Sequence, residues 1–214
     1  MEFIVQGFQQ AGVGLVFAVL MYVGHVILVS LRGRKRESWT EWLGLFAPRD
    51  LALALRYLGA FLVIGAVFGF AMRWLVPGGE AMAAQSPQHR IASLPWLWLF
   101  PAAIAYGFLT TGFTEELLFR GLIGKRFIAW FGYRSGNIAQ AVVFAALHVL
   151  IVWVGVPDAG PILYILGAGA PGLLGYYAGY AMHERGEGSI LYPWMMHAGA
   201  NFATVMVYVV APVA

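Results

Sequence analysis

The chain of 214 residues has no cysteine and few charged side chains. The absence of cysteine excludes disulfides, thiolate catalysis and Cys-ligated zinc. Only 11% of the residues are charged, against about 25% in a typical soluble domain, and 61% are hydrophobic. The composition therefore excludes an ordinary soluble domain and predicts a polytopic membrane protein. The length accommodates about six or seven spans of ~20 residues with short loops.

Six apolar segments predict an all-α transmembrane helical bundle of about six spans, with six to eight helices. They lie at 11–31, 51–76, 96–131, 137–156, 161–181 and 190–211. The third is longer than one perpendicular span requires, because ~20 residues at ~1.5 Å each cross the hydrocarbon. We therefore expect one long helix over 96–131. The region 32–50 is typical of an interfacial loop or a short surface helix.

Basic residues are concentrated in alternate loops. The regions 32–56, 125–136 and 182–189 hold ten of the 13 lysines and arginines, whereas 77–95 holds only Arg90. By the positive-inside rule, the basic loops face the cytoplasm and both termini lie outside. In a membrane protein, a net charge of +3 is attributed to loop residues that set the topology and contact anionic membrane lipids. No nucleic acid partner is expected.

Small residues gather in the fifth apolar segment. Gly175 and Gly179 form a Gly-x-x-x-Gly face, which predicts close packing against a neighbouring helix. A second interpretation concerns Pro171, which could loosen a helix that lines a route for substrate.

The stretch 114–121 places two adjacent carboxylates and an arginine inside the long apolar segment. A charge within a bilayer costs about 3 kcal/mol or more, so a chain that keeps one provides a partner and usually a function. Glu116 and Arg120 lie four residues apart and can pair along one side of a helix. Glu115 is turned by ~100° from Glu116, so it can face a cavity while its neighbour is held.

Two later segments each bring a histidine into apolar surroundings. Counted at ~1.5 Å per residue, His148 and His197 lie roughly 12–17 Å below the predicted cytoplasmic surface, a depth similar to that of the glutamate pair. Asn201 follows His197 by one turn, so both can face one site. We expect Phe144, one turn before His148, and Phe119 to wall a substrate cavity there.

These residue types carry a defined chemistry. A desolvated glutamate can act as a general base on water, and a histidine can stabilise an oxyanion, protonate a leaving amine or bind a metal. An asparagine can orient a histidine or donate to the oxyanion. The set favours addition of water to an amide. Two alternatives stay open: a non-catalytic membrane scaffold or immunity protein, and a proton-coupled carrier, because carriers use the same residue types.

Three motifs occur in order within the apolar segments: Glu115-Glu116-x-x-x-Arg120-Gly121, Phe144-x-x-x-His148 and His197-x-x-x-Asn201. In type, order and separation they resemble the signature of the CAAX protease and bacteriocin-processing (CPBP, also called Abi) family. That family comprises intramembrane endopeptidases related to the Ras-converting CAAX endopeptidase. The resemblance spans roughly 96–205. It implies a single membrane domain over 1–214, with two accessory spans and loops in 1–95 and a catalytic core in 96–211.

The resemblance implies a role for each matched residue. Glu115 would activate water, supported by the pair Glu116 and Arg120. His148 and His197 would be the catalytic histidines, and Asn201 would help to stabilise the oxyanion.

The resemblance leaves open whether the protein uses no cofactor or a divalent metal such as zinc. If a metal is present, we expect Glu115, His148 and His197 to hold it, although the zincin pattern His-Glu-x-x-His is absent. Eukaryotic members of the family are longer. A membrane-associated peptide or protein is therefore a better expected substrate than a prenylated CAAX protein. We expect the protein to lie in a bacterial or archaeal cell membrane, with its cavity facing the cytoplasm. The oligomeric state stays open.

Overall fold

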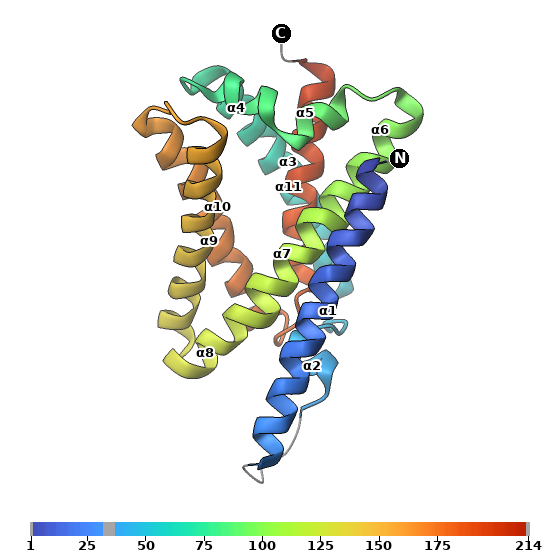
Figure 1. The fold of residues 1–214 in the computed structure, drawn as a ribbon, viewed down its shortest axis with the longest axis vertical. Helices are drawn as coiled ribbons and strands as arrows, with labels where there is room; N and C mark the ends of the chain where they lie inside the picture. Colours follow the sequence, from blue (N-terminus) through green and yellow to red (C-terminus); the bar gives the residue numbers. More distant parts are fainter. Residues whose placement is uncertain (1, 32–36, 213–214) are drawn as a thin grey trace.

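The structure, a computed structural model, describes residues 2–31 and 37–212 and is drawn in Figure 1. Over these residues every regular element is a helix, which confirms the predicted all-α class. The first helix, α1 (Glu2–Leu31), begins earlier than the expected 11–31. The expected surface helix in 32–50 is α2 (Trp39–Leu43), while residues 32–36 lie outside the described part of the chain.

Five helices are long and apolar enough to cross a membrane: Glu2–Leu31, Leu51–Leu75, Trp96–Phe131, Tyr133–Gly155 and Pro161–Arg185. The sixth expected span is α11 (Leu191–Val210), which has the length for a span but not the hydropathy. Ten of its 20 residues are buried, and it lies between α3 (Leu51–Leu75) and the long helix. A helix enclosed by protein needs less apolar surface than one that faces lipid, so α11 can carry polar site residues.

The long helix over Trp96–Phe131 is continuous, as predicted. Its parts are α6 (Trp96–Ile104), η1 (Ala105–Phe113), α7 (Thr114–Glu116), η2 (Leu117–Gly124) and α8 (Lys125–Phe131). The turns η1 and η2 are wider π-helical turns, which the sequence analysis did not predict. The hydroxyl of Thr111 donates to the carbonyl of Tyr106 at 3.0 Å, five residues earlier. π-Helical turns occur frequently at functional sites, and here they flank the glutamate pair.

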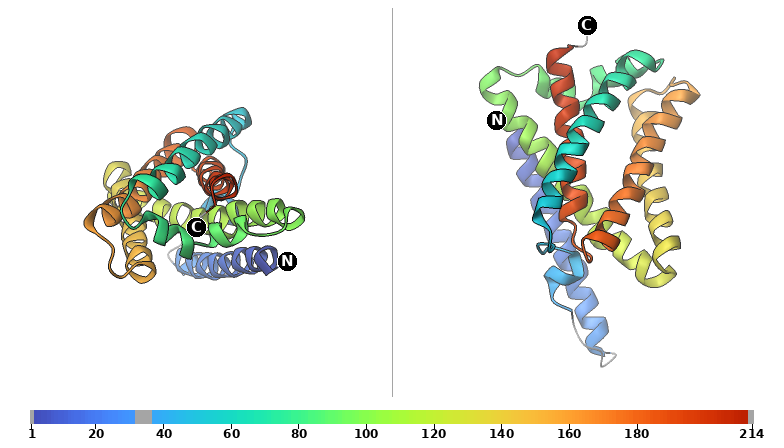
Figure 2. Two further views of the ribbon diagram at one scale, coloured as in Figure 1. Left: turned by 90° about the horizontal axis from the view of Figure 1, so that it is seen from above. Right: turned by 180° about the vertical axis from the view of Figure 1, so that it is seen from behind.

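The helix α1 packs along η1 of the long helix, and two helix pairs build the rest of the bundle. The helix α3 packs along α11, and α9 (Tyr133–Gly155) packs along α10 (Pro161–Tyr180). Figure 2 shows these pairs converging at one end and spreading toward the other. The predicted close packing at Gly179 is confirmed, because a Cβ atom there would lie 1.8 Å from the side-chain oxygen of Asn137 on α9.

The segment 77–95, expected to be a loop, holds two short helices, α4 (Gly79–Gln85) and α5 (Pro87–Ala92). Ser86 ends α4 and caps α5, accepting the backbone N–H of His89 at 3.2 Å. These helices lie at the end of the bundle toward which both chain termini point (Figure 1). α4 contacts α3 and α9, and α5 contacts α11, so together they bridge the spread ends of the two helix pairs.

Candidate active site

Glu116 and Arg120 form a fully buried ion pair, as predicted from their spacing. The Arg120 Nη1 atom lies 3.0 Å from Glu116 Oε1. The Nδ1 atom of His197 on α11 lies 2.8 Å from the same oxygen and donates its proton to it. A buried charge must be paired to be tolerated, and this pairing also fixes the ring of His197. Its Nε2 atom is thereby directed toward Glu115.

Glu115 occupies the opposite environment from its neighbour. Its side chain is 29% exposed, whereas that of Glu116 is fully buried. Its Oε2 atom lies 3.7 Å from His197 Nε2, which is too long for a hydrogen bond. Glu115 lines a cavity that Glu116 does not reach. The structure therefore places the two carboxylates as their helical angles predicted.

Phe144 on α9 joins the parts of the site. The guanidinium carbon of Arg120 lies 4.5 Å from the centre of its buried ring. The same ring meets the ring of His197 edge-on, with ring centres 5.9 Å apart. The ring of His148 lies 4.6 Å from that of Phe144. His148 Nδ1 donates to the Phe144 carbonyl at 2.9 Å, because a carbonyl can only accept. This leaves His148 Nε2 available on the cavity side.

Asn201 and Phe119 complete the set of predicted residues. Asn201 lines the cavity, and its Nδ2 atom donates to the carbonyl of His197 at 3.3 Å, leaving its second N–H available. Phe119, expected to wall the cavity, is instead buried behind Phe144, with ring centres 4.8 Å apart. The expectation is wrong because the ring of Phe144 lies between Phe119 and the cavity: Phe144 lines the cavity and Phe119 does not. Phe119 supports the wall without forming it.

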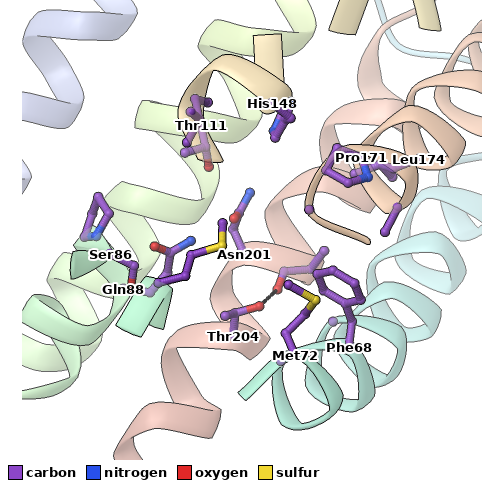
Figure 3. Close-up of a pocket in the computed structure, with 18 of the residues that line it drawn as sticks. Phe68, Met72, Ser86, Gln88, Thr111, His148, Pro171, Leu174, Asn201 and Thr204 are labelled. Atoms are coloured by element: carbon purple, nitrogen blue, oxygen red, sulfur yellow. Dashed lines mark hydrogen bonds between the residues drawn. The ribbon is translucent and has the colours of Figure 1, made fainter. Parts of the chain in front are cut away.

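The cavity has a volume of about 480 Å³ and is shown in Figure 3. It is lined by the site and by α3, α4, α5, α10 and the second half of α11. Ile64 on α3 and Ile151 on α9 are 52% and 49% exposed, so the cavity reaches the surface between the helix pairs. Pro171 lines the α10 side of the cavity, and α10 continues through it as one helix from Pro161 to Tyr180. No sequence signal marks α3 to α5 as walls of the cavity, because their lining residues carry no charge and no motif.

The cavity extends from Glu115 toward α4 and α5, the end at which the termini lie (Figure 1). The helix ends on the opposite side carry basic residues: Arg49 lies just before α3, Arg134 in the first turn of α9, and Arg185 at the end of η3 (Ala181–Arg185). Two expectations therefore conflict, since the termini cannot lie outside while the cavity faces the cytoplasm. The conflict arises because depth from one surface does not determine the direction in which a cavity opens.

The residues expected to hold a metal do not form a compact ligand group. Over residues 2–31 and 37–212, no group of three or more His, Asp or Glu side chains is placed to hold a metal ion. Glu115 and His197 are close, and His148 enters from α9 with its Nε2 atom available, but the three are not grouped as metal ligands are. The arrangement therefore does not fit the predicted three-residue site.

Residues 95–203 match the family described as Type II CAAX prenyl endopeptidase Rce1-like. The chain belongs to this family. The resemblance noted from the three motifs is thereby confirmed, and the Rce1-like family is a family of membrane proteases. The chain has no significant match among curated proteins or among solved structures.

The Rce1-like match covers only part of the cavity. It includes all six predicted catalytic residues and ends at residue 203. The cavity walls formed by α3, α4 and α5, together with Thr204 and Tyr208 on α11, lie outside it.

Proposed function

We propose that this Rce1-like protein is an intramembrane endopeptidase that hydrolyses a peptide bond with water activated by Glu115. One observation carries the proposal: Glu115 faces the cavity 3.7 Å from a histidine whose other nitrogen is anchored on a buried ion pair. A carboxylate and an oriented imidazole at this separation can both contact one water molecule.

The first step is attack by water. Glu115 takes one proton from the water, and His148 Nε2 accepts a hydrogen bond from the other, which orients the oxygen. The water oxygen bonds to the scissile carbonyl carbon, and the carbonyl oxygen becomes an oxyanion. The remaining N–H of Asn201 donates to this oxyanion, as does His197 Nε2 when the ring is protonated.

The second step is collapse of the tetrahedral intermediate. The proton on Glu115 passes to the leaving nitrogen, the C–N bond breaks, and an amine and a carboxylic acid are released. Glu116 and Arg120 take no part in these transfers. They keep the His197 ring in place, with Nδ1 occupied and Nε2 directed at the reacting groups.

Terminal peptide mapping of membranes tests the proposal and identifies substrates. Membranes that contain wild-type protein are compared with membranes that contain Glu115→Gln at equal abundance. We expect new peptide termini in the first sample and their loss in the second. Identical terminal maps, with both proteins folded, would contradict the endopeptidase proposal. A partner captured by both proteins but cut by neither would favour the scaffold alternative.

We propose that the end of the bundle opposite α4 and α5 lies in the cytoplasm, because the regions 32–56, 125–136 and 182–189 hold ten of the 13 lysines and arginines. This turns the cavity toward the other side of the membrane. The natural chain lacks cysteine, so single cysteines at Ser93 near α5 and Ser135 at the start of α9 can be labelled selectively. An impermeant reagent applied from outside should modify Ser93→Cys and spare Ser135→Cys. The reverse pattern would place the cavity toward the cytoplasm.

A further inference from the structure

Tyr106 is a buried tyrosine of the long helix that the proposed mechanism does not use. It belongs to η1, lines the cavity and is only 8% exposed. Its hydroxyl makes no hydrogen bond to any described residue, yet the oxygen remains accessible from the cavity. A buried tyrosine normally bonds its hydroxyl, as Tyr192 does by donating to the carbonyl of Asp50 at 2.8 Å. The hydroxyl of Tyr106 is therefore open to a ligand.

The π-helical turns of η1 bring Tyr106 to the same face of the helix as Glu115. Glu115 follows Tyr106 by nine positions, which in an α-helix is about two and a half turns and would place the two on opposite sides. The i→i+5 bonding of a π-helix widens each turn to about 4.4 residues, so that nine positions make about two turns. Most of this stretch is η1, and both residues line the cavity, with Thr111 between them.

The face of η1 that meets α11 repeats the same five-residue step. A Cβ atom at Gly107 would lie 3.1 Å from the carbonyl oxygen of Ala198, and one at Gly112 would lie 3.3 Å from the Cβ atom of that residue. In an α-helix, five positions differ in direction by about 140°, so the two glycines would not both meet one residue of α11. The wide turns therefore fit this close contact, which fixes the side on which Tyr106 lies.

Tyr106 lies between the glutamate pair and α5. Its ring packs with Ile91 on α5 and with Val205 on α11. The charge of Glu115 acts on its phenol, and so does the charge of Arg90 on α5. The hydroxyl thus faces the part of the cavity that runs from Glu115 toward α4 and α5.

The groups around Tyr106 match a polypeptide main chain. Thr111 and Gln88 border this part of the cavity (Figure 3), and Tyr208 lines it as well. Thr111 donates its proton to the carbonyl of Tyr106 and keeps lone pairs for a ligand, whereas Gln88 and Tyr208 offer further donors. Every residue of a main chain except proline carries one donor and one acceptor. Because a phenol stays protonated at neutral pH, the hydroxyl of Tyr106 is a donor for a carbonyl.

The distance from Glu115 decides which part of a substrate Tyr106 meets. Nine positions of η1 and α7 cover roughly 10–13 Å along the helix, and an extended chain covers about this distance in three or four residues. We infer that Tyr106 is a substrate-binding residue whose hydroxyl donates to a main-chain carbonyl three or four residues from the scissile bond. The inference rests on the proposed function and deepens it, because it names a residue that positions the substrate.

Tyr106→Phe tests the inference, since it removes the hydroxyl and keeps the ring that packs with Ile91 and Val205. With a peptide taken from a mapped cleavage site, KM should rise by about three- to tenfold, while kcat and the pH profile stay as in the wild type. Tyr177→Phe, at an exposed tyrosine of α10 that does not line the cavity, is the matched control and should change neither constant. An unchanged KM in Tyr106→Phe, or a fall in kcat alone, would overturn the inference.

Shortening the peptide one residue at a time from either end locates the contact. The difference in KM between the wild type and Tyr106→Phe should vanish when the residue three or four positions from the scissile bond is removed at one end. That end is the one that extends toward α5. A difference that persists with only two residues on each side of the scissile bond would contradict the assigned contact.

A photoreactive benzophenone amino acid at position 106 separates this inference from the proposed function. It is introduced into the Glu115→Gln variant, which retains uncut polypeptide, and the membranes are irradiated; the same group at position 177 is the control. We expect a polypeptide cross-linked at position 106 and not at position 177. If the wild-type protein cuts nothing, this cross-link still supports binding at Tyr106, and the proposed function alone fails. Cross-links to lipid only, or to nothing, would overturn the inference.

Discussion

The regions on either side of the glutamate pair differ sharply. Beneath Glu116 the bundle is closed and polar: Arg120, Asn137 and Gln140 are fully buried, and Gln140 Nε2 donates to the carbonyl of Gly175 at 2.7 Å. Beside Glu115 the bundle opens into a cavity of about 480 Å³. Two residues of one type, joined by one peptide bond, thus have different surroundings. The helix face, and not the residue type, therefore separates a buried, paired carboxylate from one that faces a cavity.

The closed region explains how charge is tolerated in an apolar bundle. Burying a charge is costly unless it is paired and hydrogen-bonded, and Glu116 receives both Arg120 and His197 on one oxygen. The same contacts hold His197 for the open region. The contacts of the closed region therefore fix the position of a side chain that lines the cavity.

The largest expected effect comes from removing the cation of the closed region. Arg120→Leu leaves the Glu116 carboxylate buried beside His197 alone, so the free energy of unfolding should fall by about 3–5 kcal/mol. Unfolding in detergent, followed by heat or by SDS titration, measures the loss. The double variant Arg120→Met with Glu116→Gln removes both charges and should recover part of the stability. A fully stable Arg120→Leu variant would contradict the structural role of the pair.

The next effect concerns the open region alone. Glu115→Gln keeps the shape of the side chain and removes the base, so cleavage of a mapped substrate should slow by about 10²- to 10⁴-fold. Glu187→Gln, at an exposed glutamate paired with Arg49, is the matched control and should leave the rate unchanged. Substrate turnover by purified protein is the measurement. Full activity of Glu115→Gln would remove this residue from the mechanism.

A smaller effect tests how tightly the closed region is packed. Gly179→Ala would bring a Cβ atom to 1.8 Å from Asn137 Oδ1, and we expect a loss of about 1–3 kcal/mol. Gly59 on α3 has no atom within 4 Å of the corresponding position. Gly59→Ala should therefore cost nothing or stabilise the helix by about 0.5–1 kcal/mol. Equal losses in the two variants, measured by unfolding, would show that packing around Gly179 is not special.

The smallest effect lies outside both regions, at α2. The Ser38 hydroxyl donates to Glu41 at 2.7 Å and its backbone N–H at 3.2 Å, and these bonds lower the pKa of Glu41. The folded-state pKa lies below the unfolded value, so the stabilisation is present at neutral pH and is lost as the pH falls through the lowered pKa. The advantage of the wild type over Glu41→Ala in unfolding midpoint should shrink in acid. An advantage independent of pH would contradict this ionic contribution.

Much of the closed region could be predicted from the sequence. The spacing of Glu116 and Arg120 predicted their ion pair, and the Gly-x-x-x-Gly pattern predicted the contact at Gly179. The single long helix followed from hydropathy and length. These predictions succeeded because helical periodicity and the cost of buried charge act locally, within one or two turns.

The open region was harder to predict because its residues are far apart in the sequence and many of them belong to no recognisable motif. Ile64 and Gln88 carry no signature, yet both line the cavity. The π-helical turns depend on hydrogen bonds one residue longer than usual, and the only hint is the threonines that donate to carbonyls five residues earlier. Asn137 and Gln140 occur near a segment end, where polar residues are common, so their buried network was not foreseen.

The most direct test of the division between the two carboxylates is a paired unfolding measurement on Glu115→Gln and Glu116→Gln in the same detergent. The buried Glu116 is bound by two partners, while Glu115 is partly exposed and has no hydrogen bond within reach. We predict a large drop in the unfolding midpoint for Glu116→Gln and almost none for Glu115→Gln. Equal drops in the two variants, or a larger drop for Glu115→Gln, would contradict the account.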